Sequence, residues 1–326
     1  MKGEAVAYPG RPDGGGLAMI HSPVMVSEVL QYLIHENSKN ILDATIGTGG
    51  HAAAILERCS SVRLIGLDRD PTSLRLACDR LSRFGERVKL VQGVFADLTH
   101  ALVGIGRVDG VLADLGVSSA QLDSPERGFS HQADGPLDMR MGTEGVPAAE
   151  WIERSDVEEI ASVLRRYGEV RSAKRLARAI KLAADRGQLR TTAQLRSVVQ
   201  GTLGAAATPS EMSRVFQAFR IQANSEMKQL DAFLAGVLDH ANPKARIVVI
   251  AYHSLEDRAV KAWLRLESAS CICPPGVPVC ACGHLPRVRV LTKRVVRPSP
   301  VEVSSNSRAR SARLRAAETL STGVRT

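Results

Sequence analysis

A short apolar run, a glycine-rich turn and a second apolar run that ends on an aspartate most constrain how this chain can fold. The first run, residues 40–45, leads into Gly47, Gly49 and Gly50, and the second run ends on Asp68. Glycines at such a place let the chain turn tightly and bring backbone amides close to a ligand at the start of a helix. A carboxylate that ends the next strand can accept hydrogen bonds from two ribose hydroxyls. The pattern therefore predicts a parallel α/β sheet with a nucleoside site at its carboxyl edge.

Two later apolar runs extend the same sheet and bracket a long helical stretch. Residues 108–114 and 245–252 have the composition of buried strands, whereas the hydrophobic residues between them recur at helical spacing. Thr191 or Thr192 is expected to cap one of these helices. We therefore predict a Rossmann-like α/β sheet built from residues 21–124 and 224–326, an inserted and mostly helical domain at 125–223, and a flexible arm at 1–20.

Positive charge is concentrated near the end of the 326-residue chain. The net charge is +9, and from Leu285 onward ten lysines and arginines accompany only two acids, Glu302 and Glu318. A one-sided basic tract suits a polyphosphate partner such as RNA, although a solvated tail without a ligand would have the same composition. No run approaches the roughly 18 apolar residues of a membrane span, and the start lacks the apolar core of a signal peptide. We expect a cytoplasmic protein without membrane contact.

The glycine string itself narrows the choice of nucleoside. Dinucleotide sites use G-x-G-x-x-G, but here the string is G-x-G-G-H, without a third glycine in register. The Gly-Lys-Ser/Thr of a P-loop is also missing from it. A compact ligand without a pyrophosphate, such as S-adenosylmethionine, fits better. A nicotinamide-dependent oxidoreductase would explain the sheet but not the basic end, and a non-catalytic RNA-binding scaffold would leave the glycine turn without a purpose.

Six further strings follow in order along the chain, at residues 114–123, 127–130, 134–141, 216–221, 253–258 and 306–315. Together they closely resemble the RsmH (MraW) family of ribosomal RNA small-subunit methyltransferases H, from about residue 21 to residue 318. The resemblance implies transfer of a methyl group from S-adenosylmethionine to the N4 amine of a decoding-centre cytidine in 16S rRNA. It also implies the small ribosomal subunit as the partner and leaves a homodimer open. Tyr252 stands where the family usually has phenylalanine.

The same resemblance implies roles for individual residues. The cofactor residues would be Gly49, Gly50, His51, Asp68, Phe95, Asp114 and Gln121, with Asp68 on the ribose and Phe95 against the adenine. Phe95 is alternatively an ordinary core aromatic. Because an exocyclic amine needs an acceptor nearby, we also expect Asp114, Ser118, Ser119 or backbone carbonyls there to orient the target amine. The concentration of positive charge, and not the resemblance, predicts RNA contacts at Lys174 and Arg178 and at Arg308, Arg310, Arg313 and Arg315. Further substrate contacts are expected at Arg140, Arg214 and His253, although Arg140 could instead join the insert to the sheet and His253 could instead cap the following helix.

Four cysteines cluster as two C-x-C pairs, Cys271 with Cys273 and Cys280 with Cys282. Four thiolates suit tetrahedral zinc, but C-x-C is tighter than the usual spacing of zinc ribbons. A redox-sensitive thiol cluster and plain reduced cysteines in a surface loop are the alternatives.

Overall fold

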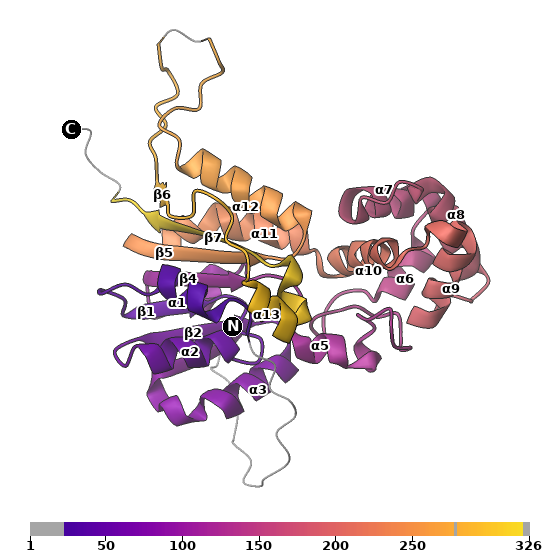
Figure 1. The fold of residues 1–326 in the computed structure, drawn as a ribbon, viewed down its shortest axis with the longest axis horizontal. Helices are drawn as coiled ribbons and strands as arrows, with labels where there is room; N and C mark the ends of the chain where they lie inside the picture. The colour runs from indigo at the N-terminus through magenta and orange to yellow at the C-terminus, as the bar shows by residue number, and fades with distance from the viewer. Residues whose placement is uncertain (1–22, 277–278, 322–326) are drawn as a thin grey trace. The chain divides into compact units, whose positions relative to one another are not determined.

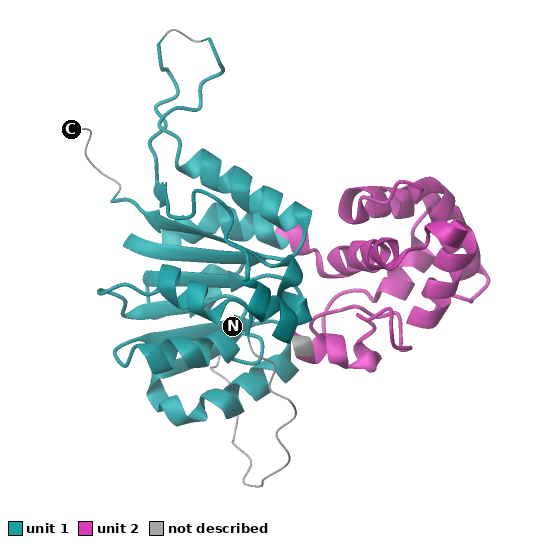
Figure 2. Cartoon of the chain, in the orientation of Figure 1, with its two compact units in different colours: residues 1–116, 229–326 teal, residues 117–228 magenta. Residues whose placement is uncertain are grey.

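The structure is a computed structural model that describes residues 23–276 and 279–321. The predicted arm at 1–20 lies outside the described residues. The chain divides into two compact units, the first made of residues 1–116 and 229–326 and the second of residues 117–228 (Figure 2). The insert predicted at 125–223 lies within the second unit, which also takes in the short helix α5 (Ser119–Asp123).

The first unit is built on a seven-stranded sheet in the order β3-β2-β1-β4-β5-β7-β6 (Figure 1). Its strands are β1 (Asn40–Asp43), β2 (Arg63–Asp68), β3 (Val88–Gln92), β4 (Val108–Asp114), β5 (Ala241–Ala251), β6 (Val288–Val290) and β7 (Arg313–Thr319). The pairs from β3 to β5 are parallel, whereas β7 runs antiparallel to both β5 and β6. The predicted Rossmann-like α/β sheet is confirmed.

Helices precede or connect these strands. They are α1 (Val26–Leu33), α2 (Gly50–Arg58), α3 (Pro71–Leu81), α4 (Leu98–Ala101), α11 (Glu226–Gly236), α12 (Ser254–Glu267) and α13 (Pro300–Ser305). All of them except α13 bury apolar residues. The core joins Ile41 and Leu112 of the sheet to Ile55 of α2 and Leu74 of α3, all at most 1% exposed. Because each crossover returns the chain in the same direction, the carboxyl ends of the parallel strands lie at one edge.

The second unit is helical and has a hydrophobic core of its own. Its longer helices are α6 (Ala148–Arg154), α7 (Val157–Gly168), α8 (Ala173–Asp185), α9 (Thr192–Leu203) and α10 (Pro209–Asn224). Fully buried side chains from α7, α8 and α10, such as Leu164, Leu176 and Phe219, meet in that core. Thr191 caps α9 by accepting a hydrogen bond from Gln194 N, as one of the two predicted caps. No helix among the described residues is long and apolar enough to cross a membrane.

The basic end of the chain is more ordered than the sequence analysis expected. It contributes β7 between β5 and β6, and neither β6, β7 nor β3 had been predicted. Several of its cations form ion pairs inside the first unit: Arg289 with Glu318 at 2.6 Å, and Arg315 with Asp257 at 2.7 Å. Part of the excess positive charge is therefore neutralised within the fold.

Candidate active site

Three aspartates end three neighbouring parallel strands of the first unit. Asp43 is the last residue of β1, Asp68 of β2 and Asp114 of β4. Because β2, β1 and β4 are adjacent and parallel, all three carboxylates belong to the same edge of the sheet. Only Asp68 and Asp114 were predicted as site residues. Asp43 was missed, because the predicted first run extends to residue 45, whereas β1 ends at Asp43.

The Asp68 carboxylate organises the glycine turn. Its Oδ2 accepts a hydrogen bond from Gly47 N at 2.9 Å, and its Oδ1 accepts one from Asp70 N at 2.8 Å. Burial raises the pKa of Asp68 to about 6, against the lowering effect of these two amides. A carboxylate has about four lone-pair sites, so two more donors can be accommodated.

Gly49 occupies a position that a side chain would strain. It is the N-cap of α2 and has a left-handed backbone, with φ of +79°. A Cβ there would come within 3.2 Å of Leu81 in α3, tighter than an ordinary contact. Glycine at this position therefore lets the turn that leads into α2 pack closely against α3.

Asp114 has a different partner on each carboxylate oxygen. The Tyr252 hydroxyl donates to Oδ1 at 2.9 Å, and Nε2 of His51 lies 3.4 Å from Oδ2. The backbone N–H of Asp114 donates to Oγ1 of Thr45 at 2.7 Å. Burial, followed by the nearby Asp114 charge, raises the pKa of Tyr252 well above its usual value, so the phenol stays a donor. Tyr252 and Thr45 were not predicted as site residues.

His51 and Asp43 are both buried, at 6% and 1% exposure. Burial raises the pKa of Asp43 to about 7, although His51 and the Thr45 amide act in the opposite direction. Burial alone would lower the pKa of His51, but Asp114, Asp43 and Glu302 together raise it. Nδ1 of His51 is buried and has no hydrogen-bond partner among the described residues. Nε2 also makes no hydrogen bond with the described residues, apart from its 3.4 Å approach to Asp114, so the edge combines three acids with a buried histidine.

The residue pattern matches a known family along nearly the whole chain. A model of the MraW methylase family matches residues 18–320. Ribosomal RNA small subunit methyltransferase H of Nitratidesulfovibrio vulgaris is 45% identical over 320 residues, covering 95% of this chain and 89% of that protein. The chain belongs to the MraW methylase family. The family resemblance stated from the sequence is thereby confirmed.

A second relative and a solved structure are also similar to this chain. The protein named ribosomal RNA small subunit methyltransferase H in Syntrophotalea carbinolica is 46% identical over 303 residues, covering 91% of this chain and 96% of that one. An rRNA methylase structure from Streptococcus thermophilus gives a TM-score of 0.40 at 12% identity, covering 93% of this chain and 100% of that chain. The fold assignment therefore rests on strand order and not on this superposition.

Phe95 follows β3 in this MraW-family chain and is half-buried. Its ring packs against Phe233 of α11, with centroids 5.7 Å apart and planes tilted by 60°. One part of Phe95 thus belongs to the core, as the alternative interpretation held. Phe95 is only half-buried, so part of the residue remains exposed.

Ser118 and Gln121 belong to the second unit and bond to each other. Ser118 Oγ accepts from Gln121 N at 3.2 Å, and Gln121 Oε1 accepts from Ser118 N at 3.0 Å, forming the capping box of α5. Gln121 Nε2 also donates to Met141 O at 3.3 Å. Ser119 is the first residue of α5, and its side chain lies outside what the structure describes.

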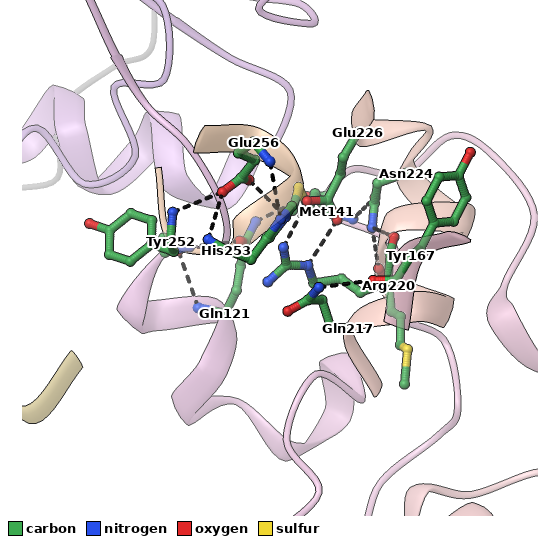
Figure 3. A network of polar contacts seen from close by, with 12 residues as sticks. Gln121, Met141, Tyr167, Gln217, Arg220, Asn224, Glu226, Tyr252, His253 and Glu256 are labelled. Carbon is green, nitrogen blue, oxygen red and sulfur yellow. Dashed lines mark hydrogen bonds and ion pairs between the residues drawn. The ribbon is translucent and has the colours of Figure 1, made fainter. Parts of the chain in front are cut away.

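One family string, residues 134–141, is bonded to the end of α10 inside the second unit (Figure 3). Asn224 at the end of α10 donates to Met139 O at 2.7 Å and accepts from Met141 N at 2.8 Å. Arg220, from the string at 216–221, forms a bidentate ion pair with Glu226, with both distances 2.8 Å. The Asn224 contacts join residues 134–141 to α10, and the Arg220 pair joins α10 to the start of α11, so both strings contain residues with a structural role.

His253 has the capping role that the sequence analysis gave as its alternative. It is the N-cap of α12 (Figure 3). Its ring atom Nδ1 accepts a hydrogen bond from the backbone N–H of Glu256 at 3.3 Å, and its own backbone N–H donates to Glu256 Oε2 at 3.2 Å. Nε2 of His253 also lies 3.1 Å from Glu256 Oε1. Its ring is therefore held by Glu256.

The predicted RNA contacts differ in how strongly they are held. Arg140 donates two hydrogen bonds to the Asp138 carboxylate, from Nε to Oδ1 at 2.7 Å and from Nη2 to Oδ2 at 2.8 Å. Lys174 pairs with Glu158 at 2.6 Å in an exposed position, where such a pair contributes little. The exposed Arg214 lies 3.6 Å from the half-buried Glu211. Three others are on the surface: Arg178 and Arg310 are exposed and Arg308 is half-buried.

Proposed function

We propose that this chain binds S-adenosylmethionine at the carboxyl edge of its sheet and methylates the exocyclic N4 amine of a cytidine in the decoding region of 16S rRNA. The observation that supports this most is the 45% identity, over 95% of the chain, to a ribosomal RNA small subunit methyltransferase H. A nicotinamide-dependent oxidoreductase has no comparable support.

The residues at the edge suit the proposed cofactor chemically. Asp68 has capacity for ribose hydroxyls, because its two backbone donors leave lone pairs unused. S-adenosylmethionine carries positive charge on its sulfonium and on its amino group. The acids at the ends of β1, β2 and β4 complement that charge. Nδ1 of His51 lacks a partner among the described residues and is suited to a polar group of a ligand or to water. The accessible part of Phe95 suits an adenine ring.

S-adenosylmethionine would supply an activated methyl group at a positively charged sulfur. The protein's task is then to align the amine, exclude water and receive one proton. An exocyclic cytosine amine is a poor nucleophile because its lone pair is delocalised into the ring. We propose that the Asp114 carboxylate accepts an amine N–H and so localises that lone pair. Tyr252 and His51 hold this carboxylate in one orientation.

Several finer assignments belong to the same proposal. Ser118 and Ser119 would help to orient the amine, and Gln121 would contribute to the cofactor pocket. The second unit would recognise RNA, with the small ribosomal subunit as the partner. The target base would leave its stack to reach the methyl group. A cytoplasmic location follows from an rRNA substrate.

Mass spectrometry of rRNA nucleosides tests the proposal directly. Cells that lack the gene should lose N4 methylation at one 16S cytidine, and the intact gene should restore it. A gene that encodes Asp114→Asn should restore it poorly, although the protein is folded. If the nucleoside profile is the same with and without the gene, this substrate is wrong.

A further inference from the structure

The segment between α12 and β6 carries a side-chain cluster that methyl transfer does not use. The described residues of the stretch 268–287 leave the sheet unit as a long excursion and form no helix or strand (Figure 1). At its base, Arg287 N donates to Glu267 O at 2.7 Å, and Nε2 of His284 lies 3.0 Å from Leu266 O. Excursions of this length without secondary structure are uncommon and need a reason to keep their shape.

This loop has no hydrophobic core to stabilise it. None of its described residues is buried, and its apolar side chains Ile272, Val279 and Leu285 are 49%, 75% and 54% exposed. Hydrophobic burial therefore does not explain why distant parts of the loop come together. A cross-link is the usual means by which such a small element keeps one conformation.

The four cysteine sulfurs of the loop meet at one point. Cys273 Sγ lies 4.0 Å from Cys280 Sγ, Cys280 Sγ lies 3.5 Å from Cys282 Sγ, and Cys282 Sγ lies 3.8 Å from Cys271 Sγ. All four lie within 4.8 Å of one another. Four ligands at about 2.3 Å from a tetrahedral zinc ion stand about 3.8 Å apart. The separations match that value and are far longer than a disulfide bond of about 2.05 Å.

Backbone amides also point at two of the sulfurs. Ile272 N donates to Cys282 Sγ and Cys273 N donates to Cys271 Sγ, both at 3.4 Å. Such N–H groups stabilise thiolates, which are the forms that bind metal. His284 is an unsuitable fifth ligand through Nε2, because that atom faces Leu266 O.

We propose that Cys271, Cys273, Cys280 and Cys282 bind one structural zinc ion that fastens the 268–287 loop. Four protein ligands leave no open position, so the ion has no role in the chemistry of methyl transfer. The proposal is independent of the substrate proposed above, since it concerns only this loop.

Elemental analysis of the full-length chain tests the site. Protein prepared with a reductant and without chelators should contain about one zinc per chain. The Cys273→Ser/Cys280→Ser variant should fall to background. The Cys59→Ser/Cys78→Ser variant, which changes the two cysteines outside the loop, should keep its zinc. Zinc that persists in the first variant, or is missing from the wild type, would overturn the proposal.

Two measurements on the wild type test the site without relying on a variant that could fail to fold. Cobalt added to metal-depleted protein should give the visible absorption bands of a tetrahedral thiolate site. Chelation should speed hydrogen exchange in residues 268–287 and leave α2 protected. Protein that binds no cobalt and whose loop cysteines prove to be disulfide-bonded by mass spectrometry would also overturn the assignment.

Discussion

The hydroxyl of Tyr252 donates a 2.9 Å hydrogen bond to Oδ1 of Asp114 and so joins the residue that follows β5 to the end of β4. Tyr252 and His51 thereby contact different carboxylate oxygens of Asp114, Tyr252 by this hydrogen bond and His51 by the 3.4 Å approach of Nε2 to Oδ2. A carboxylate held at both oxygens cannot rotate freely, which is a useful property in a group proposed to accept an amine N–H.

Tyr252→Phe should weaken the first unit, because it removes a hydrogen bond to a charged group while keeping the ring. The expected loss in free energy of unfolding is about 1.5–3 kcal/mol. The chain has two tryptophans, Trp151 in the second unit and Trp263 in the first. In a Trp151→Phe background, the fluorescence of Trp263 during urea unfolding therefore reports on the first unit. Tyr32→Phe is the control, and equal midpoints for both tyrosine variants would contradict the expectation.

Asp68→Asn should weaken binding of S-adenosylhomocysteine by roughly ten- to a hundredfold, because a charge-assisted hydrogen bond to ribose is worth about 1.5–3 kcal/mol. Asparagine can still accept a hydrogen bond from the turn, whereas Asp68→Ala would leave the Gly47 and Asp70 amides without their acceptor. The alanine variant should therefore also lose stability. Isothermal titration on folded protein measures the affinity. An unchanged affinity in the asparagine variant would refute the ribose role of Asp68.

Much of this edge could be predicted from the sequence because local rules determine it. A glycine turn after one apolar run and an aspartate at the end of the next describe a strand, a helix start and a second strand. The strand that ends on Asp114 was predicted with the bounds that the structure has, and Thr191 caps its helix as expected. These features depend on neighbours a few residues away.

The features that were missed depend on distant contacts. β7 was not predicted because residues 313–319 mix two arginines and a glutamate with apolar residues. Pairing with β5 and β6 and the ion pairs to Asp257 stabilise them as a strand. Tyr252 differs from the family's usual phenylalanine by one hydroxyl, and its partner Asp114 is 138 positions earlier. No local pattern could reveal that contact.

The contribution of Asp43 and Asp68 to the stability of the ligand-free protein should fall as pH rises from about 4 to about 7. Burial raises the pKa of Asp43 from 3.8 to about 7 and that of Asp68 to about 6. In this range the folded state retains protons that the unfolded state has lost, so the free energy of unfolding decreases with pH. The raised pKa of His51 acts in the same direction.

Asp43→Asn isolates the largest of these contributions. The amide oxygen can still accept from Thr45 N, but it carries no charge. The variant should gain stability relative to the wild type at pH 8 and lose that advantage near pH 4. Urea midpoints followed through Trp263 at both pH values measure the difference. A difference that does not change with pH would show that Asp43 is not the group responsible.

Cations that bind RNA phosphates should respond to substitution differently from cations that stabilise the fold. On α8, Arg178 is exposed and Lys174 pairs with Glu158 on the surface, where a phosphate can replace the acid at little cost. Lys174→Ala/Arg178→Ala should weaken RNA binding and reduce the slope of log affinity against log salt by about 0.7–0.9 per lost phosphate contact. Affinity for S-adenosylhomocysteine should stay the same.

Two double variants near the end of the chain compare arginines expected to bind RNA with arginines that stabilise the fold. Arg308→Ala/Arg310→Ala should reduce the salt slope as the α8 variant does. Arg313→Ala/Arg315→Ala should instead destabilise the sheet unit, because both arginines pair with Asp257, at 3.7 and 2.7 Å, and their loss leaves a half-buried acid without its cations. Fluorescence anisotropy of a labelled 16S fragment at several salt concentrations, with urea midpoints for each variant, distinguishes the two classes. If neither the α8 variant nor the Arg308/Arg310 variant changes the salt slope, RNA phosphates must be bound by other residues, and the second unit needs a different role.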